Sequence, residues 1–195
     1  IDLLANGSER TAELDRALAV AREVYMTRAG DLSTRRRAAA PVFSKTLEKS
    51  LADLAMARTR CEVRFVPAQS DADWTERGLE QAEFYISPNP GEDVKPLARI
   101  ASGGELSRIM LALKTLGSND APGKTLIFDE VDTGIGGAVA DVVGVRLQNL
   151  AKRFQVLCIT HLPQIAAYGG THLSISKSVN SSNHRSTVAW RPPDS

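Results

Sequence analysis

The sequence predicts an α/β fold, in which a mostly parallel sheet with flanking helices follows a long helical arm. Positions 8–57 are rich in Ala, Leu, Arg and Glu and contain a single glycine, Gly30, a composition typical of long helices. After Cys61, short apolar runs alternate with helical patterns, as they do in β-α units. The runs "LIF" and "VLCI" are apolar throughout, which is typical of central strands covered on both faces. We therefore divide the chain into an arm, 1–58, and a lobe, 59–195.

Apolar residues at helical spacing predict the helices of the arm. They form two narrow stripes among charged residues: Leu14, Leu18, Ala21 and Tyr25, then Phe43, Leu47, Leu51 and Leu54. Pro41 lies between the stripes and is expected to begin or kink a helix, because proline has no backbone N–H. A narrow stripe suits a coiled coil, but an ordinary amphipathic helix packed on the chain's own core fits the spacing equally well. A lone coiled-coil strand would leave Leu47, Leu51 and Leu54 half exposed unless another chain or the lobe covers them.

Strand and helix patterns follow one another in order through the lobe. Positions 61–68 alternate apolar and polar residues, as a half-buried strand does, and a second strand ends at Pro88. The polar stretches 69–78 and 178–184 are expected to be turns. The other expected elements are a helix at 103–116, a strand at 125–128, a helix at 138–153, a strand at 155–160, a short helix at 163–168, and strands at 172–178 and 185–190.

Composition excludes several classes of protein. The net charge of +1, from 24 basic and 23 acidic residues, argues against a large basic surface for nucleic acid, and the run 35–37 is expected to be a solvated helix face. Cys61 and Cys158 are far apart, with no C-x-x-C motif, so we expect two buried, reduced thiols and neither a disulfide scaffold nor a zinc site. No apolar run approaches the roughly 20 residues that span a bilayer.

Two glycine-bearing stretches resemble nucleotide-binding loops without matching them. "GSNDAPGKT", 117–125, departs from the G-x-x-x-x-G-K-[ST] pattern at Pro122 or Ser118, depending on the glycine from which the count starts. It also leads from a helix into a strand, whereas a phosphate loop leads from a strand into a helix. "GIGGAV", 134–139, misses G-x-G-x-x-G because Val139 takes the third glycine position. The sequence therefore contains no phosphate-binding loop.

Two acidic residues close an apolar strand. Asp129 and Glu130 follow "LIF", and ligands gather at the carboxyl ends of strands in open α/β sheets. A carboxylate in this position can hold Mg²⁺, and a second one beside it can polarise an attacking water. Two exposed acids at the end of a strand are the alternative interpretation.

Two further motifs stand at the edges of expected elements. In "SGGE", Ser102 is placed as a helix N-cap with Glu105 at the capping-box position, and Gly103 and Gly104 allow close approach of an anion to the helix start. Plain helix capping explains this motif equally well. His161 follows the run "VLCI" and could contact a terminal phosphate or be a core histidine.

The order of these motifs makes a resemblance specific. "SGGE", "LIFDE", "DTG" and "ITH" follow the order of the ABC-type ATPase head: signature motif, Walker B, D-loop and switch histidine. "FYISPNPGE", "PLARIASGGELSRIMLALKTL", "TLIFDEVDTGIGG" and "VLCITHLPQIAAYG" are similar to the RecN family of SMC-like bacterial DNA repair proteins, over about 32–177. The resemblance implies the C-terminal lobe of an ABC/SMC-type ATPase head, preceded by the returning segment of a coiled-coil arm. It is weakest at the end of the chain, which stops at "RPPDS" where members of the family usually carry another helical stretch.

The resemblance also implies roles for individual residues. Asp129 would coordinate Mg²⁺, Glu130 would be the general base for water attack on ATP, and His161 would sense the γ-phosphate. The segment 102–105 would contact ATP held by the opposite head, and Asp132 would lie in the D-loop and help to join the two heads. ATP and Mg²⁺ are thus the implied cofactors.

Partners and function follow from the same resemblance. The implied partners are an N-terminal half-head of the same protein, which carries the phosphate-binding loop, a second head in a homodimer, and DNA. The implied function is ATP-driven head dimerisation in double-strand break repair and recombination, in the cytoplasm with the nucleoid and without a membrane. This chain alone is expected to be inactive. An ABC transporter nucleotide-binding domain, against which the arm argues, and a non-catalytic dimerisation module are the alternatives.

Overall fold

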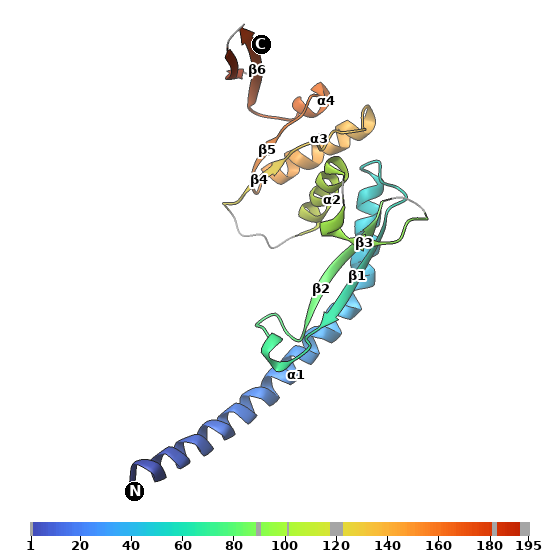
Figure 1. The fold of residues 1–195 in the computed structure, drawn as a ribbon. Coiled ribbons are helices and arrows are strands. Elements are labelled where there is room, and N and C mark those ends of the chain that lie inside the picture. The colour runs from blue at the N-terminus through green and yellow to red at the C-terminus, as the bar shows by residue number, and fades with distance from the viewer. Residues whose placement is uncertain (1, 89–90, 101, 118–122, 181–182, 192–195) are drawn as a thin grey trace.

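The chain forms a long helix that leads into a small α/β lobe (Figure 1). The computed structural model describes residues 2–88, 91–100, 102–117, 123–180 and 183–191. Its elements are α1 (Asp2–Ala52), β1 (Arg60–Pro67), η1 (Asp71–Asp73), β2 (Glu80–Ser87), β3 (Lys95–Pro96), η2 (Leu97–Arg99), α2 (Gly103–Leu116), β4 (Thr125–Phe128), α3 (Ala138–Ala151), β5 (Gln155–Cys158), α4 (Pro163–Ala166), β6 (His172–Asn180) and β7 (Asn183–Arg191). Most of the loop at 117–125 and the tip of the turn at 178–184 lie outside the described residues.

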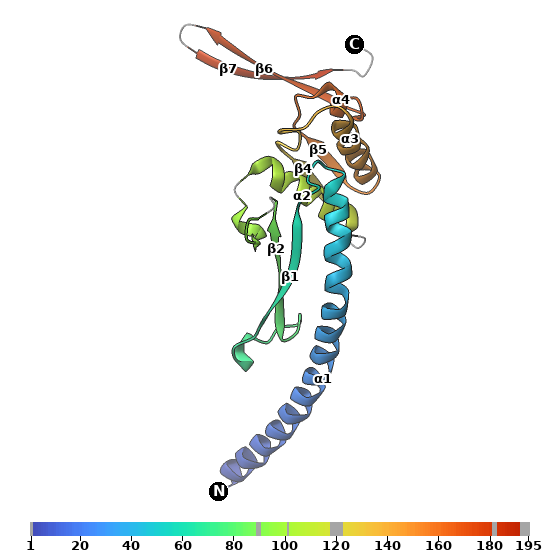
Figure 2. The ribbon, with the colours of Figure 1, turned by 90° about the vertical axis from the view of Figure 1, so that its right-hand side faces the viewer.

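The arm is one helix and not two. Pro41 lies inside α1, which runs for 51 residues, so the expectation that a helix begins at Pro41 is wrong. The ribbon curves along its length without a sharp break (Figure 2). Proline removes one backbone hydrogen bond from a helix. Tyr25 and Phe43, one on each side of Pro41, pack on Trp74 and Phe84 of the following hairpin, so contacts hold the helix both before and after the proline.

The second apolar stripe of the arm belongs to the core of the lobe. Leu47, Leu51 and Leu54 are fully buried, so the lobe covers the stripe that an unpaired coiled-coil strand would have left half exposed. Phe43 packs on Phe84 of β2, with ring centroids 5.5 Å apart. Other core residues come from β2, α2, β4, α3 and α4, among them Ile86, Ile109, Leu111, Phe128, Val143, Leu147 and Ile165. The end of α1 is therefore an ordinary amphipathic helix packed on the chain's own core.

A β-hairpin runs along the arm and is fastened to it at the tip. β1 pairs with β2 in an antiparallel register from Arg60↔Ser87 to Pro67↔Glu80, and the pair lies beside α1 (Figure 2). In the connecting loop, Trp74 stacks on Tyr25 of α1 with centroids 4.9 Å apart. The Tyr25 hydroxyl donates a hydrogen bond of 3.1 Å to the Thr75 carbonyl, and Arg22 forms an ion pair of 2.8 Å with Asp71. The hairpin therefore covers one face of α1 as far as Tyr25.

The first apolar stripe continues the covered face beyond the hairpin. Leu14, Leu18, Ala21 and Tyr25 follow one another at intervals of three or four residues and therefore lie on the same side of the helix. They remain 55% and 67% exposed. This helical face thus has two environments. The chain's own lobe covers it from Tyr25 towards the C-terminal end of α1, and it is exposed from Tyr25 towards the N-terminal end.

We expect these two environments to differ in amide hydrogen exchange. Amides at 8–20 should exchange fast because few contacts oppose local unfolding there, whereas those at 29–51 should be protected. Trp74→Ala should extend fast exchange towards Leu32 by removing the stack on Tyr25, and Trp74→Phe, which keeps a ring, should do so less. Equal protection of the two segments in a monomeric chain would contradict this prediction.

The α/β fold class is confirmed by the structure of the lobe. Among the described residues, only two strands pair in parallel. β4 and β5 pair in parallel, from Thr125↔Gln155 to Phe128↔Cys158, while β1–β2–β3 and β6–β7 are antiparallel. A crossover helix, α3, connects β4 to β5, as a parallel pair requires. The β6–β7 hairpin extends away from the rest of the lobe (Figure 1).

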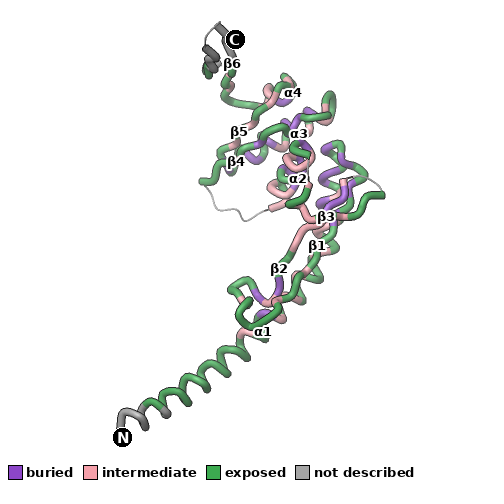
Figure 3. The backbone as a smooth tube through the Cα atoms, in the orientation of Figure 1, coloured by how far each residue is buried: buried purple, intermediate pink, exposed green. Residues whose placement is uncertain are grey.

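One face of the β4–β5 pair is open, as green segments along both strands show (Figure 3). Ile127, Leu157 and Ile159 are exposed, Ile127 by 66%, so the expectation that both faces are covered is wrong for this chain. β6 and β7 also place exposed apolar residues opposite one another, as Leu173↔Trp190 and Ile175↔Val188. Contiguous apolar faces of this kind are typical of interaction surfaces.

Both cysteines are free, as expected, but they differ in burial. Cys61 is buried and Cys158 is half-buried. Burial raises the pKa of each thiol to about 11, and nearby carboxylates add to the shift. Both thiols therefore remain protonated at neutral pH. No helix in the described part of the chain is long and apolar enough to cross a membrane.

Candidate functional site

The start of α2 packs closely against the segment that follows β4. Ser102 is its N-cap, as expected, and the Ser102 hydroxyl accepts a hydrogen bond of 3.4 Å from the Glu105 backbone N–H. A Cβ on Gly104 would lie only 2.8 Å from the Thr133 side chain and 3.0 Å from the Glu130 carbonyl oxygen. A Cβ on Gly103 would overlap the Glu130 carboxylate. Gly104 is thus required for α2 to pack against the segment 129–133, whereas a side chain at Gly103 would only displace the flexible Glu130 carboxylate.

Two residues further along α2 hold the same segment. The Ser107 hydroxyl donates a hydrogen bond of 2.5 Å to the Asp129 carbonyl. Arg108 donates one of 2.8 Å from Nη1 to the Thr133 carbonyl and is only 7% exposed. Burial lowers the pKa of Arg108, partly offset by the nearby charge of Glu105. Sequence reasoning missed both residues, although they lie one helical turn beyond Gly104 on the same face.

Asp129 and Glu130 lie at the carboxyl end of β4, where the sequence predicts them. Both are exposed. Glu130 has a backbone φ of 56°, in the left-handed region that is uncommon for residues other than glycine. Such a conformation costs on the order of 1 kcal/mol and persists where surrounding contacts impose it, as α2 does here. The strain places the Glu130 side chain beside the start of α2.

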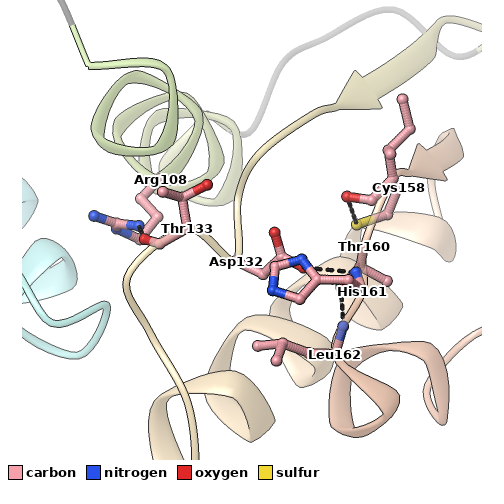
Figure 4. A network of polar contacts seen from close by, with 8 residues as sticks. Arg108, Asp132, Thr133, Cys158, Thr160, His161 and Leu162 are labelled. Carbon is pink, nitrogen blue, oxygen red and sulfur yellow. Dashed lines mark hydrogen bonds and ion pairs between the residues drawn. The ribbon is translucent and has the colours of Figure 1, made fainter.

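Asp132 lies in the same segment but turns into the lobe, where it meets the residues after β5 (Figure 4). It is 3% exposed. One carboxylate oxygen, Oδ2, accepts hydrogen bonds from the Thr160 hydroxyl at 2.5 Å and from the His161 backbone N–H at 2.9 Å. Burial opposes ionisation, but these hydrogen bonds and the attraction of His161 outweigh it and lower the pKa of Asp132. Asp132 is therefore a buried carboxylate with satisfied hydrogen bonds.

His161 points outward from this network. Its side chain is 76% exposed, and Nδ1 lies 3.1 Å from Oδ2 of Asp132. It is thus not a core histidine, which was one of the two interpretations of the sequence. The ring is free to meet a ligand on its outer side while Asp132 holds its inner side.

The segment 129–133 joins all the expected site residues. On one side it packs against the "SGGE" helix start through Glu130 and Thr133, and on the other it binds His161 through Asp132. Asp129 is the carboxylate that could hold Mg²⁺. Mg²⁺ commonly takes one or two carboxylates together with phosphate oxygens and water, so a single carboxylate is compatible with the ion, although the described residues contain no group of three or more possible metal ligands.

Comparison with known proteins gives close relatives over nearly the whole chain. No protein-family model matches it. The chain is 42% identical over 178 residues to the DNA repair protein RecN of Halalkalibacterium halodurans, which covers 91% of the chain and 32% of that protein. It is 43% identical over 188 residues to RecN of Treponema pallidum, with 95% and 32% covered. The chain is a RecN-type segment.

Solved structures agree on the fold of this RecN-type segment. The Smc head domain with an extended coiled coil from Pyrococcus furiosus, bound to the C-terminal domain of ScpA, aligns with a TM-score of 0.56 over 97% of the chain and 44% of that structure, at 18% identity. The Smc head domain with a coiled coil and joint from Pyrococcus yayanosii aligns with a TM-score of 0.56 over 95% and 33%, at 17% identity. The SMC-type head fold implied by the motifs is confirmed.

The RecN-type chain spans about a third of the length of the curated relatives it matches. Within the site, Ser107, Arg108 and Thr160 are the polar residues that sequence reasoning missed. Their signal is spacing: the first two lie one turn beyond the glycines, and Thr160 directly precedes His161.

Proposed function

We propose that this chain is the signature-bearing lobe of an SMC-like ATPase that acts in DNA double-strand break repair and recombination. The observation that carries the proposal is the packing of the "SGGE" helix start against the segment 129–133, which in turn binds His161. Three motifs that are far apart in the sequence thereby share one edge of the lobe. The RecN relatives support a role in DNA repair, and DNA enters the proposal through them alone.

The residues divide the chemistry of ATP hydrolysis among them. Asp129 would hold Mg²⁺, which neutralises charge on the phosphates. Glu130 lies next to it and would accept a proton from the attacking water. His161, held on its inner side, would contact the γ-phosphate with its outer side. Each role uses a side chain that is exposed at the edge where β4 and β5 end.

A second head would receive the "SGGE" segment. Ser102 and Gly103 are exposed, while Gly104 is buried against Thr133. The N-terminus of α2 carries free backbone N–H groups and a positive dipole end, which favour an anion. We propose that these groups meet ATP bound by the opposite head. Asp132 would contribute to joining by fixing the shape of its segment, because its carboxylate is buried.

The N-terminal half-head would cover the open faces of the lobe. The exposed residues Ile127, Leu157 and Ile159 form an apolar face at the β4–β5 pair. An additional strand with its helix would bury this face and bring the phosphate-binding loop to Asp129. Leu14 and Leu18 would pair with the outgoing helix of the arm. By the same resemblance, we place the protein in the cytoplasm with the chromosome.

Turnover tests the proposal directly. We expect the 195-residue chain alone to hydrolyse no ATP, because signature and Walker B residues cannot replace the ring of N–H donors in a phosphate-binding loop. The full-length protein should hydrolyse ATP with Mg²⁺ and without a membrane. Turnover by the purified chain that Glu130→Gln abolishes would contradict the assignment, as would a full-length protein without ATPase activity.

A further inference from the structure

We propose that Asp132 is a positioning residue that fixes the orientation of His161, and that Arg108 ties the same segment to the signature helix α2. The inference rests on the proposed ATP hydrolysis and adds residues that act on it without touching the nucleotide. Asp132 would act through the histidine, and Arg108 through the segment that carries Asp132.

One carboxylate oxygen organises the turn that follows β5. Oδ2 of Asp132 accepts hydrogen bonds from the Thr160 hydroxyl and the His161 backbone N–H, and it lies 3.1 Å from Nδ1 of the His161 ring. The Thr160 hydroxyl in turn accepts from the Leu162 N–H at 3.1 Å. Backbone and ring of His161 are thus held by the same atom. Hydrogen bonds to an ionised acceptor are about twice as strong as neutral ones, so this anchor is firm.

The arrangement also decides which atom of the ring can act. The hydrogen bond made by one imidazole nitrogen sets the role of the other. Because Nδ1 faces Asp132, Nε2 is left for the nucleotide. An exposed ring without this contact would sample several rotamers, and most of them would place Nε2 away from the γ-phosphate.

The burial of Asp132 argues for a positioning role and against direct contact of its carboxylate with a second head. The carboxylate is 3% exposed, so it cannot reach another molecule without breaking its hydrogen bonds. Breaking them would leave a buried charge unpaired, which is costly. The positioning role therefore leaves the hydrogen bonds of Asp132 intact, whereas direct contact with a second head would require them to break.

The next residue extends the link to α2. The Thr133 carbonyl accepts a hydrogen bond of 2.8 Å from the buried Arg108, and Figure 4 shows this pair on the opposite side of the segment from His161. Two consecutive residues therefore contact the signature helix and the switch histidine. A displacement of α2 when "SGGE" meets a phosphate would reach His161 through two hydrogen-bonded contacts.

The test is a double-mutant cycle in the full-length protein. Asp132→Asn should lower kcat by about 10–100-fold, the usual range for residues that orient a functional side chain, while KM for ATP stays unchanged. In the His161→Ala background the same change should lower kcat no further. Asp141→Asn removes an exposed carboxylate from the first turn of α3 and should leave kcat unchanged. An unchanged kcat in Asp132→Asn, or effects that multiply in the double variant, would overturn the proposal.

A second pair of variants applies if Asp132→Asn fails to fold. Thr160→Val keeps the shape of the side chain and removes one donor to Asp132, whereas Thr160→Ser keeps the donor. We expect kcat to fall in the first and to recover in the second. Equal activity of the two variants would count against the network.

Crystal structures give a readout that does not depend on turnover. In Asp132→Asn the His161 ring should lose its single orientation, while the start of α2 remains in place. A ring that keeps its orientation overturns the positioning role even in an active enzyme. If the unmodified full-length protein hydrolyses no ATP, the proposed function fails, and the ring orientation still decides this inference.

Discussion

Glu130→Gln in the full-length protein should lower the rate of ATP hydrolysis by a factor on the order of 10²–10⁴, the usual cost of losing a general base, and leave ATP binding intact. Glutamine keeps the shape of the side chain and can still hydrogen-bond the attacking water, but it cannot accept its proton. The Glu130 backbone at a φ of 56° is equally accessible to both residues, so the fold should not change. Joined heads should then accumulate with ATP.

Sedimentation and single-turnover kinetics measure the two parts of this prediction. Glu130→Gln should sediment as a dimer with ATP, and its burst of phosphate should be missing. Glu76→Gln is the matched control, because it makes the same chemical change at an exposed position in the loop between β1 and β2. Hydrolysis at an unchanged rate in Glu130→Gln would rule out the general-base role. A loss of ATP binding would indicate that Glu130 is required for the site to form.

Ser102→Arg should abolish ATP-dependent joining of the heads while each head still binds ATP. Ser102 is exposed at the start of α2, where we propose that the phosphate of the partner's nucleotide approaches. Arginine adds a long, positively charged side chain at the point where, in the proposed function, the start of α2 must approach the partner's nucleotide closely. Turnover should fall with dimerisation, because in the proposed function hydrolysis requires the joined heads.

Ser102→Ala separates blocked joining from lost capping. It removes the hydroxyl that accepts from the Glu105 N–H, at a cost of about 1 kcal/mol to the stability of the helix, but adds no bulk. We expect this variant to sediment as a dimer with ATP and the arginine variant to remain a monomer. Equal dimerisation of both would mean that "SGGELSR" is only a capped helix.

Several features of the site follow from local sequence. The N-cap at Ser102 and the position of Asp129 and Glu130 after a strand depend on neighbours within a few residues, and the structure has them where the sequence predicts them. The apolar spacing in the arm likewise predicts α1. Apolar residues recur in the arm at the 3.6-residue period of an α-helix, so the residues themselves indicate the helix without reference to any distant segment.

Other features depend on elements that are far apart in the sequence. The spacing of Leu47 and Leu51 is the same whether a partner helix or the lobe covers them, and only packing against β1, β2 and α2 decides for the lobe. Pro41 is tolerated inside α1 for the same reason. The inward turn of Asp132 arises because Thr160 and His161, nearly thirty residues later in the sequence, come to lie beside it through the parallel pairing of β4 and β5.

The sequence by itself determined the motifs, their order, the helical arm and the α/β class, since each of these depends on residue type and local spacing. The tertiary structure decided which faces are buried, that Asp132 holds His161, and that Arg108 holds Thr133. Burial and hydrogen bonding between distant residues are properties of pairs of elements, and a single pattern along the chain does not specify its partner. For that reason the open faces at Ile127 and at Leu14 became visible only when the elements that cover the rest of the core were in place.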